Sequence, residues 1–210
     1  MPFRSMSLEE FARHIAMDAR EVRRLADRGK LPGQKVGGLW RFNRARVTEW
    51  LQQEMPKLDE SRLIALEEAM SGPRPGSARD TRMSVTELID VNGVAATLPA
   101  KTKGSVLRRL VELAERTGML YDAPGLLEAL QEREDLYSTA LPNGVAIPHP
   151  RQPMPYVSAE PFVCVGRVIG GVAFGGAHRE LTRLFFLICS HDDRGHLHVL
   201  ARLTRLLDPA

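Results

Sequence analysis

Apolar side chains in the first 56 residues recur at helical spacing and then alternate as they do in strands. Capping boxes at residues 7–10 (Ser-Leu-Glu-Glu) and 18–21 (Asp-Ala-Arg-Glu) predict two short helices that begin eleven residues apart. The two helices share an apolar seam, made by Phe11, Ile15, Val22 and Leu25. Residues 34–42 predict two short strands around a Gly-Gly turn, and Asn43 is placed to cap a third helix. This is the element order of a winged helix-turn-helix module.

After Pro56 the pattern predicts a further helix and then a linker. The helix is amphipathic, with acidic neighbours around the apolar residues Leu58, Leu63, Leu66 and Met70. It either supplies part of a contact between two copies of the chain or packs as a spacer on its own domain. Residues 71–79 combine Gly, Pro and Ser where neither helix nor strand persists, so they predict a linker.

From about residue 83 onward the pattern predicts helices around a small sheet. Apolar residues at helical spacing cover 103–117, 123–133 and a last stretch that contains His196. Apolar runs typical of strands cover 144–148, 162–168 and 183–189, and residues 85–89 fit either a strand or a short helix. We therefore expect an α/β (α+β) chain. Its parts are a winged helix-turn-helix domain at 1–56, a helix and linker at 57–82, and a domain with a small mixed sheet flanked by helices at 83–210.

Charge changes this picture more than composition does. The 210 residues are 43% hydrophobic and 26% charged, as in ordinary globular proteins. Residues 1–56 hold eleven Lys and Arg against seven Asp and Glu, whereas the remainder holds 18 against 19. The basic excess is therefore N-terminal, which favours a polyanion-binding module there. No apolar run is long enough for a membrane span and no signal peptide opens the chain, so we expect a cytoplasmic protein without membrane contact.

The basic side chains of the module are candidates for DNA binding. Arg20, Arg23, Arg24 and Arg28 fall outside the apolar stripe of the second predicted helix, and Lys35 and Arg41 lie on the wing. The helix is placed to enter a major groove of double-stranded DNA while the wing holds the backbone. The alternative is a solvated basic face on a protein-interaction module. Because one such helix reads only a few base pairs, DNA binding also implies a homodimer.

Several short sequence motifs of the module resemble those of a known family. They are Leu8-Glu-Glu-Phe-Ala12, Gly29-Lys-Leu-Pro32, Gly37-Gly-Leu-Trp-Arg-Phe42 and Trp50-Leu51. With them, the segment from Ser5 to Leu51 resembles the excisionase/MerR-type DNA-binding family. Trp40 and Trp50 lie in the apolar pattern, so we expect them to pack in the core.

One histidine stands out in the C-terminal part. Gly144-Val-Ala-Ile-Pro-His149 ends an apolar run on an imidazole, where Pro148 favours an extended approach and Gly144 allows a turn with positive φ. We therefore expect the ring of His149 at the surface. Arg133 lies 16 residues before it and His196 lies 47 residues after it.

These residue types suit phosphoryl transfer. A neutral imidazole is nucleophilic at one ring nitrogen when the other nitrogen keeps its proton. A guanidinium and a second imidazole can then stabilise the charge on the phosphoryl oxygens, which makes Arg133 and His196 the natural helpers of His149. Taken singly, His149 fits an ordinary loop histidine, and Arg133, between two glutamates, fits a solvated helix face.

Together the three positions resemble the IIA domain of the fructose/mannitol/nitrogen-regulatory class of the bacterial sugar phosphotransferase system, over about residues 84–210. In that family the histidine of an Ile-Pro-His motif accepts a phosphoryl group, an arginine lies beside it and a second histidine completes the pocket. The family usually has a small residue with a free amide after the histidine, whereas Pro150 has no N–H and Arg151 is the candidate to compensate. The family also usually carries one more element after the last helix, so the resemblance implies a shortened C-terminal edge.

The resemblance implies no metal and no cofactor. A metal cluster at His191, His196 and His198 is disfavoured, because residues two apart diverge on a helix, and we expect His191 and His198 to be exposed. Cys164 and Cys189 lie in apolar runs without the spacing of a metal or redox motif, so we expect reduced core residues, with a disulfide as the alternative.

The sequence thus leads to three hypotheses. The first is a DNA-binding regulator whose IIA-like domain is phosphorylated on His149 by a phosphocarrier protein, with the added charge altering DNA binding. The second is a IIA subunit for sugar uptake with a protein-docking N-terminal domain, and the third is a DNA-binding protein with a IIA-fold sensor that is never phosphorylated. The first hypothesis requires that a phosphate donor can reach His149 and that Arg133 and His196 converge on it.

Overall fold

A computed structural model describes residues 5–71, 84–175 and 180–207 of the chain. The N-terminal part follows the predicted order of elements. These are β1 (Ser5–Met6), α1 (Leu8–His14), α2 (Ala19–Asp27), β2 (Gly33–Val36), β3 (Leu39–Asn43) and α3 (Arg44–Glu54). Ser7 and Glu10 form the predicted capping box of α1, and Asn43 caps α3 by accepting a hydrogen bond from the Arg46 amide. Asp18 caps α2 through the Arg20 amide, without the second half of a box.

The wing is a small antiparallel sheet with the strand order β1-β3-β2. Its turn is Gly37-Gly38, and both glycines have positive φ, which L side chains rarely adopt. The sequence pattern misses β1, because a strand of two residues has no periodicity to read. Phe42 on β3 stacks on Phe11 of α1 with 4.1 Å between ring centroids. Trp40 and Trp50 pack against the same core, as predicted.

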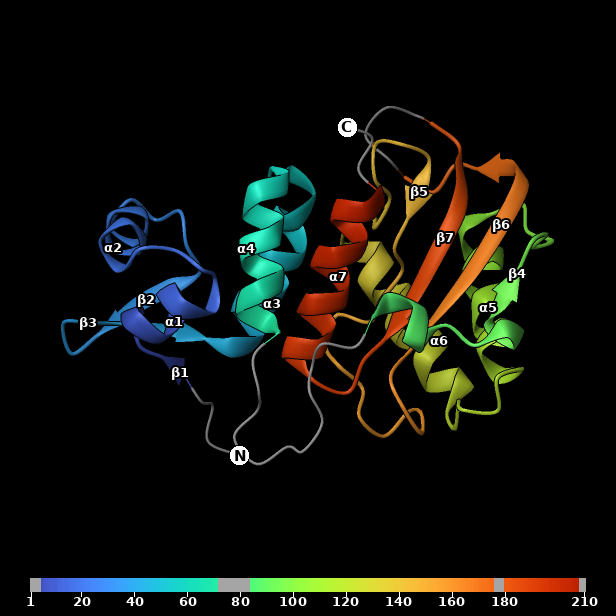
Figure 1. The fold of residues 1–210 in the computed structure, drawn as a ribbon, viewed down its shortest axis with the longest axis horizontal. Coiled ribbons are helices and arrows are strands. Elements are labelled where there is room, and N and C mark those ends of the chain that lie inside the picture. The colour runs from blue at the N-terminus through green and yellow to red at the C-terminus, as the bar shows by residue number, and fades with distance from the viewer. Residues whose placement is uncertain (1–4, 72–83, 176–179, 208–210) are drawn as a thin grey trace.

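The predicted amphipathic helix is α4 (Glu60–Met70), which follows the short 3₁₀ helix η1 (Met55–Lys57). Its apolar residues Leu63, Leu66 and Met70 are buried. They pack within the chain, because α4 lies against α7 (Asp193–Leu207) as well as α1 (Figure 1). The apolar face of α4 is therefore used inside one molecule. Residues 72–79 of the predicted linker lie outside the described residues.

The C-terminal part contains a four-stranded mixed sheet with the order β4-β6-β7-β5. Its strands are β4 (Val94–Ala95), β5 (Val145–Ala146), β6 (Phe162–Val172) and β7 (Thr182–Cys189). The central pair β6 and β7 is antiparallel, and each edge strand runs parallel to its neighbour. Of the predicted run 144–148 only two residues form a strand, and residues 85–88 form a 3₁₀ helix, η2 (Val85–Leu88), rather than a strand. A second 3₁₀ turn, η3 (Val91–Gly93), precedes β4.

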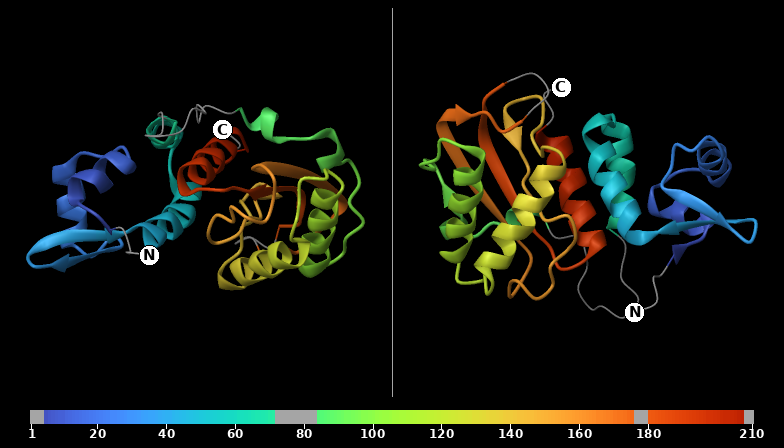
Figure 2. Two further views of the ribbon diagram at one scale, coloured as in Figure 1. Left: turned by 90° about the horizontal axis from the view of Figure 1, so that it is seen from below. Right: turned by 180° about the vertical axis from the view of Figure 1, so that it is seen from behind.

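Helices cover both faces of this sheet (Figure 2). Alternate residues of β6 point to opposite faces, so that Val163 joins the core with α7 whereas Phe162 and Cys164 join the core with α5 (Lys103–Glu115) and α6 (Ala123–Leu136). Cys164 and Cys189 are buried and free, as expected of reduced core residues. α6 runs three residues past the predicted end at Arg133.

Candidate functional site

His149 sits just beyond β5, where the backbone on both sides is tied to the sheet. Gly144 has φ +75°, and its carbonyl oxygen accepts a hydrogen bond from the Arg183 amide at 2.8 Å. The Ile147 amide donates to the Thr139 carbonyl at 3.1 Å, and the Ile188 amide donates to the Pro148 carbonyl at 2.9 Å. The predicted positive φ at Gly144 is therefore present, and these hydrogen bonds hold the histidine just past the end of a short edge strand.

The tautomer of His149 follows from its hydrogen bond. Nδ1 lies 2.6 Å from the Ile147 carbonyl oxygen, which can only accept, so Nδ1 carries the proton and Nε2 keeps its lone pair. Nε2 is buried and has no hydrogen-bond partner among the described residues. The free nitrogen is the one that a nucleophilic imidazole needs.

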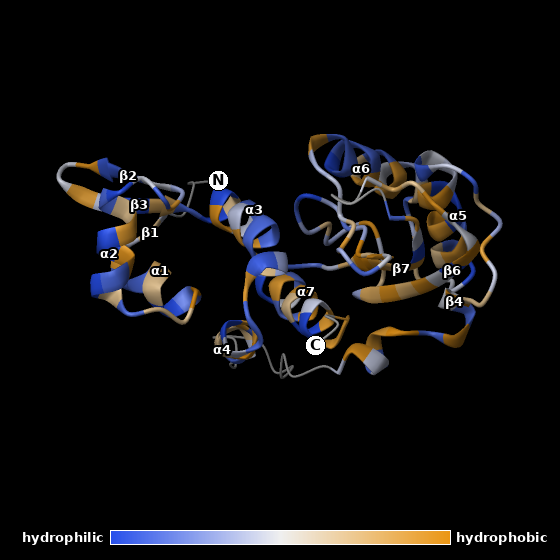
Figure 3. Ribbon diagram, turned by 90° about the horizontal axis from the view of Figure 1, so that it is seen from above, coloured by the Kyte–Doolittle hydropathy of each residue, from blue (hydrophilic) through white to orange (hydrophobic). Residues whose placement is uncertain are grey.

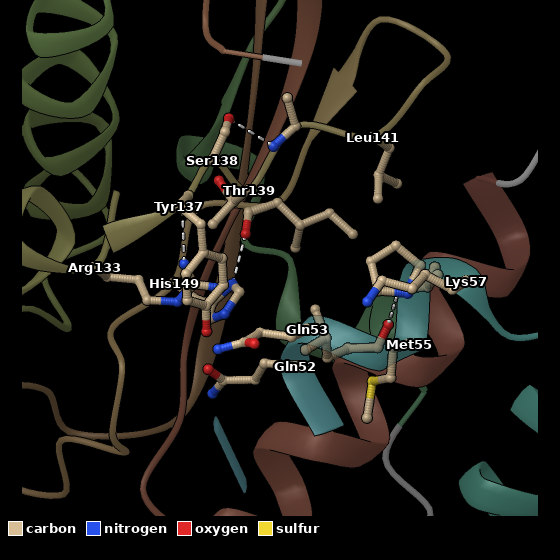
Figure 4. Close-up of a pocket in the computed structure, with 15 residues that line it drawn as sticks. Gln52, Gln53, Met55, Lys57, Arg133, Tyr137, Ser138, Thr139, Leu141 and His149 are labelled. Atoms are coloured by element: carbon tan, nitrogen blue, oxygen red, sulfur yellow. Dashed lines mark hydrogen bonds between the residues drawn. The ribbon is translucent and has the colours of Figure 1, made fainter. Parts of the chain in front are cut away.

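The two predicted helpers lie beside this ring. The His196 ring on α7 has its centroid 5.1 Å from that of His149. Arg133 on α6 is only 2% exposed and lines the same cavity of about 330 Å³ as His149 (Figure 4). It is not the solvated residue that its glutamate neighbours suggested. The structure thus brings together all three residues that the sequence singled out.

Tyr137, which the sequence did not single out, holds Arg133 in place. The guanidinium carbon lies 3.9 Å from the centroid of the Tyr137 ring, and Nη1 donates to the Tyr137 carbonyl at 3.0 Å. The neighbouring Glu134 carboxylate accepts from the amide and hydroxyl of Thr139, which fixes the loop that follows α6. Nε of Arg133 has no partner among the described residues. This nitrogen is therefore left as a free donor in the cavity.

Both imidazoles of the site are neutral near pH 7. Burial, followed by the charges of His196 and Arg133, holds the pKa of His149 well below its usual value of 6.5. Burial and the charge of Arg133 lower the pKa of His196 to about 4. In each case removal from water disfavours the charged form. The neutral form of His149 is the one that can attack phosphorus.

The expectation that His149 is presented at the surface is wrong in this structure. The side chain is 3% exposed and His196 is 1% exposed. The cover comes from the N-terminal part, because α3 lies over the site and contributes Gln52 and Gln53 to the cavity wall (Figure 4). Sequence reasoning missed Gln52 because nothing in the pattern of one module shows which face it turns to another.

The remaining histidines of the last segment differ in their surroundings. His198 is 2% exposed rather than exposed as expected, and its Nδ1 lies 3.1 Å from the Ser71 hydroxyl next to α4. His191 is half-buried, with Nε2 3.0 Å from the Ser158 hydroxyl. Within the described residues no group of three His, Cys, Asp or Glu side chains is placed to hold a metal ion.

The candidate DNA-binding residues lie on α2, at its C-cap Arg28 and on the wing, and α2 and the wing form the end of the molecule farthest from the mixed sheet (Figures 1 and 3). Exposed side chains among them are Arg20, Arg23, Arg24, Arg28 and Lys35, and Arg41 is half-buried. Lys35 forms an ion pair with Asp27 at 3.0 Å, and Arg24 forms one with Glu21 at 3.2 Å. No helix in the described part of the chain is long and apolar enough to cross a membrane.

Comparisons with known proteins agree with this two-part organisation. The family model of the phosphoenolpyruvate-dependent sugar phosphotransferase system, EIIA 2, matches residues 87–210, and that of a helix-turn-helix domain matches residues 5–55. A nitrogen regulatory protein of Bradyrhizobium diazoefficiens is 31% identical over 128 residues, which cover 60% of this chain and 80% of that protein. A fructose-specific EIIABC component of Bacillus subtilis is 29% identical over 127 residues, 60% of this chain but only 20% of that protein.

Solved structures show the same likeness. The IIA mannitol protein of Escherichia coli superimposes with a TM-score of 0.51 at 25% identity, over 58% of this chain and 84% of that one. The nitrogen regulatory protein IIA-Ntr of Neisseria meningitidis superimposes with a TM-score of 0.51 at 25% identity, over 57% of this chain and 81% of that one. The chain therefore belongs to the EIIA 2 family of the phosphoenolpyruvate-dependent sugar phosphotransferase system and carries a helix-turn-helix domain before its EIIA domain.

Proposed function

We propose that this protein is a DNA-binding regulator of the cytoplasm whose EIIA domain accepts a phosphoryl group on His149 from a phosphocarrier protein. In this function, phosphorylation by the phosphotransferase system changes the affinity of the protein for double-stranded DNA. The observation that carries the proposal is the neutral, unpartnered Nε2 of His149, with Arg133 and His196 beside it, in a chain that also presents exposed arginines on a helix-turn-helix domain.

The transfer step needs only groups that the site and the donor supply. The lone pair of His149 Nε2 forms the new P–N bond, and the donor's bond to phosphorus breaks with its electron pair left on the donor nitrogen. The proton on Nδ1 stays there, bonded to the Ile147 carbonyl. As charge spreads over the equatorial oxygens, the free Nε donor of Arg133 stabilises it.

Mapping the modified residue tests the site. The protein is incubated with a phosphocarrier relay, and the phosphorylated residue is identified by mass spectrometry under alkaline conditions that preserve phosphohistidine. We expect label on His149, full loss in His149→Ala, and retention in His191→Ala, which changes a histidine outside the cavity. Label that survives His149→Ala would refute the assignment of the phosphoryl acceptor.

A second measurement tests the DNA half of the proposal. Binding of phosphorylated and unphosphorylated protein to duplex DNA is titrated against salt, because phosphate contacts make affinity fall steeply with salt concentration. A regulator of this kind binds two half-sites as a homodimer. Since the apolar face of α4 is already buried against α7, the contact between two copies has to use another surface. Equal affinity of both forms at every salt concentration would refute the coupling.

One observation favours a second candidate function. The helix-turn-helix domain contacts the EIIA domain through α3, and the α4 helix that follows it packs more extensively on α7, which is the behaviour of a protein-docking module. This supports an EIIA subunit for sugar uptake with a docking domain. Restoration of sugar uptake in a strain without its EIIA would distinguish this subunit from the DNA-binding regulator.

The absence of an N–H at Pro150 favours a third candidate, an EIIA-fold sensor without phosphorylation, which the mapping experiment tests directly.

A further inference from the structure

Polar side chains on the middle and last turns of α3 make the cover over His149. Gln52 is 4% exposed, and its amide nitrogen lies 2.9 Å from His196 Nε2 and 3.4 Å from the Arg151 carbonyl oxygen. That carbonyl can only accept, so the amide nitrogen faces the site and His196 Nε2 accepts as well. The docked helix therefore holds His196 in the tautomer that cannot donate from Nε2 to a phosphoryl oxygen.

Two more contacts hold the middle of the helix. Glu49 pairs with Arg151 at 2.8 Å, and the Thr48 hydroxyl donates to Asp193 at 3.2 Å. Arg151 therefore turns to α3 instead of compensating at His149 for the missing amide of Pro150. Just past the C-terminal end of α3, three residues after Gln52, Met55 is fully buried and lines the cavity with Leu200 of α7. The polar contacts of Thr48, Glu49 and Gln52 can exchange for contacts with water at little net cost.

A protein donor cannot reach His149 while α3 is docked. In-line transfer brings the donor's phosphorus within about 3 to 3.5 Å of Nε2. The side chain is 3% exposed and lies under the helix, so a folded partner has no path to it. A phosphoryl group would also bring about −2 charge next to Arg133, on which the Glu49 carboxylate already acts. Like charges therefore oppose return of the helix after transfer.

We infer that α3 is a cap on the phosphoryl-transfer site: its docked position excludes the phosphoryl donor, and it has to move away from His149 before transfer. The inference rests on the proposed function for the identity of the donor, while the cap itself is a property of the unmodified chain. The DNA-facing α2 and wing point away from the EIIA domain in the docked state, so capping leaves that face uncovered (Figure 1). The position of the helix-turn-helix domain, not access to α2, is what phosphorylation changes.

Chemical modification measures the cap without any phosphotransfer. Diethyl pyrocarbonate acylates the free nitrogen of neutral imidazoles, and mass spectrometry gives the rate at each histidine of the full chain near pH 7. Glu49→Arg removes the pair across the contact and sets two arginines against each other. Glu54→Arg is the matched control, because Glu54 is on the same helix and pairs at 2.7 Å with Lys57, three residues later in the chain, not with a residue of the EIIA domain.

We expect acylation of His149 to be about tenfold faster in Glu49→Arg than in the unchanged protein, which corresponds to about 1.4 kcal/mol. In Glu54→Arg the rate stays within about twofold. The double variant Glu49→Arg/Arg151→Glu restores the pair with reversed charges and returns the rate toward that of the unchanged protein. Gln52→Ala gives a second way to loosen the cap should Glu49→Arg fail to fold.

Phosphorylation then separates the two proposals. Glu49→Arg is expected to raise the rate with a phosphocarrier protein about tenfold but the rate with phosphoramidate, a small donor, by less. Equal acylation rates in all variants, or equal acceleration by Glu54→Arg, would overturn the cap and leave the proposed function standing. Faster acylation in Glu49→Arg without phosphorylation by either donor would uphold the cap and refute the proposed function.

Discussion

Acidification should weaken the folded state through the buried histidines of the site. The pKa of His196 is lowered from 6.5 to about 4, so the unfolded chain binds a proton between these values and the folded chain does not. Stability conferred by the neutral ring is therefore complete above pH 6.5 and is lost as pH falls toward 4. The ring is 1% exposed, so little of the effect is screened by solvent.

The magnitude follows from the two pKa values. At pH 5 the unfolded chain gains about 2 kcal/mol from protonating His196, and the full difference is about 3 kcal/mol. His149 adds to the loss in the same direction, because burial also lowers its pKa. A loss of this size is a large part of the stability of a typical domain.

Urea unfolding at several pH values between about 7.5 and 5 measures the effect. We expect the free energy of unfolding to fall with acidification. Its slope against pH reports the number of protons that the chain takes up on unfolding, and this number should decrease by about one in His196→Gln. The variant keeps a polar side chain that can meet Gln52 but does not titrate. An unchanged slope in His196→Gln, or a flat profile in the unchanged protein, would show that the ring is not held neutral by burial.

Other perturbations test the packing and the two surfaces. Phe42→Ala removes the ring that stacks on Phe11 in a fully buried position and is expected to cost about 3 to 5 kcal/mol, measured by urea unfolding; a loss below about 1 kcal/mol would contradict the packing. Arg133→Met keeps much of the buried volume but removes the charge, so phosphorylation of His149 should slow by about 100-fold or more in a timed labelling assay, and an unchanged rate would exclude Arg133 from the transfer. Arg23→Ala should reduce the salt dependence of DNA binding by about 0.9 in log–log slope if it meets a phosphate, while Arg109→Ala on α5 leaves the slope unchanged.

Local signals in the sequence sufficed for most elements. Ser7 and Asn43 mark helix starts because a side-chain oxygen can satisfy a free backbone amide only there, and both cap as expected. The Gly37-Gly38 pair marks the hairpin turn for a similarly local reason, since both residues need positive φ. The sequence pattern does not predict the two-residue strands β1 and β4, because only their pairing with distant strands identifies them.

The site was only partly foreseeable. Arg133, His149 and His196 could be singled out, and they do meet, but the burial of the ring depends on a helix 97 residues earlier, at Gln52. The periodicity of the sequence predicts that α3 has a polar face, but it does not predict which residues that face contacts. The same holds for His198, whose place against Ser71 and α4 removes it from solvent. Contacts between domains were thus the part that the pattern of one chain could not show.

The hydrophobic cluster that runs from Phe11 through Leu66 to Leu203 does not stop at the boundary between the two families. Each half taken alone would leave part of this cluster facing water, α4 in one fragment and α7 in the other. A calorimetric scan of the intact chain should therefore show one cooperative melting transition instead of two. A substitution that loosens this cluster in either part is then expected to lower the melting temperature of both parts together.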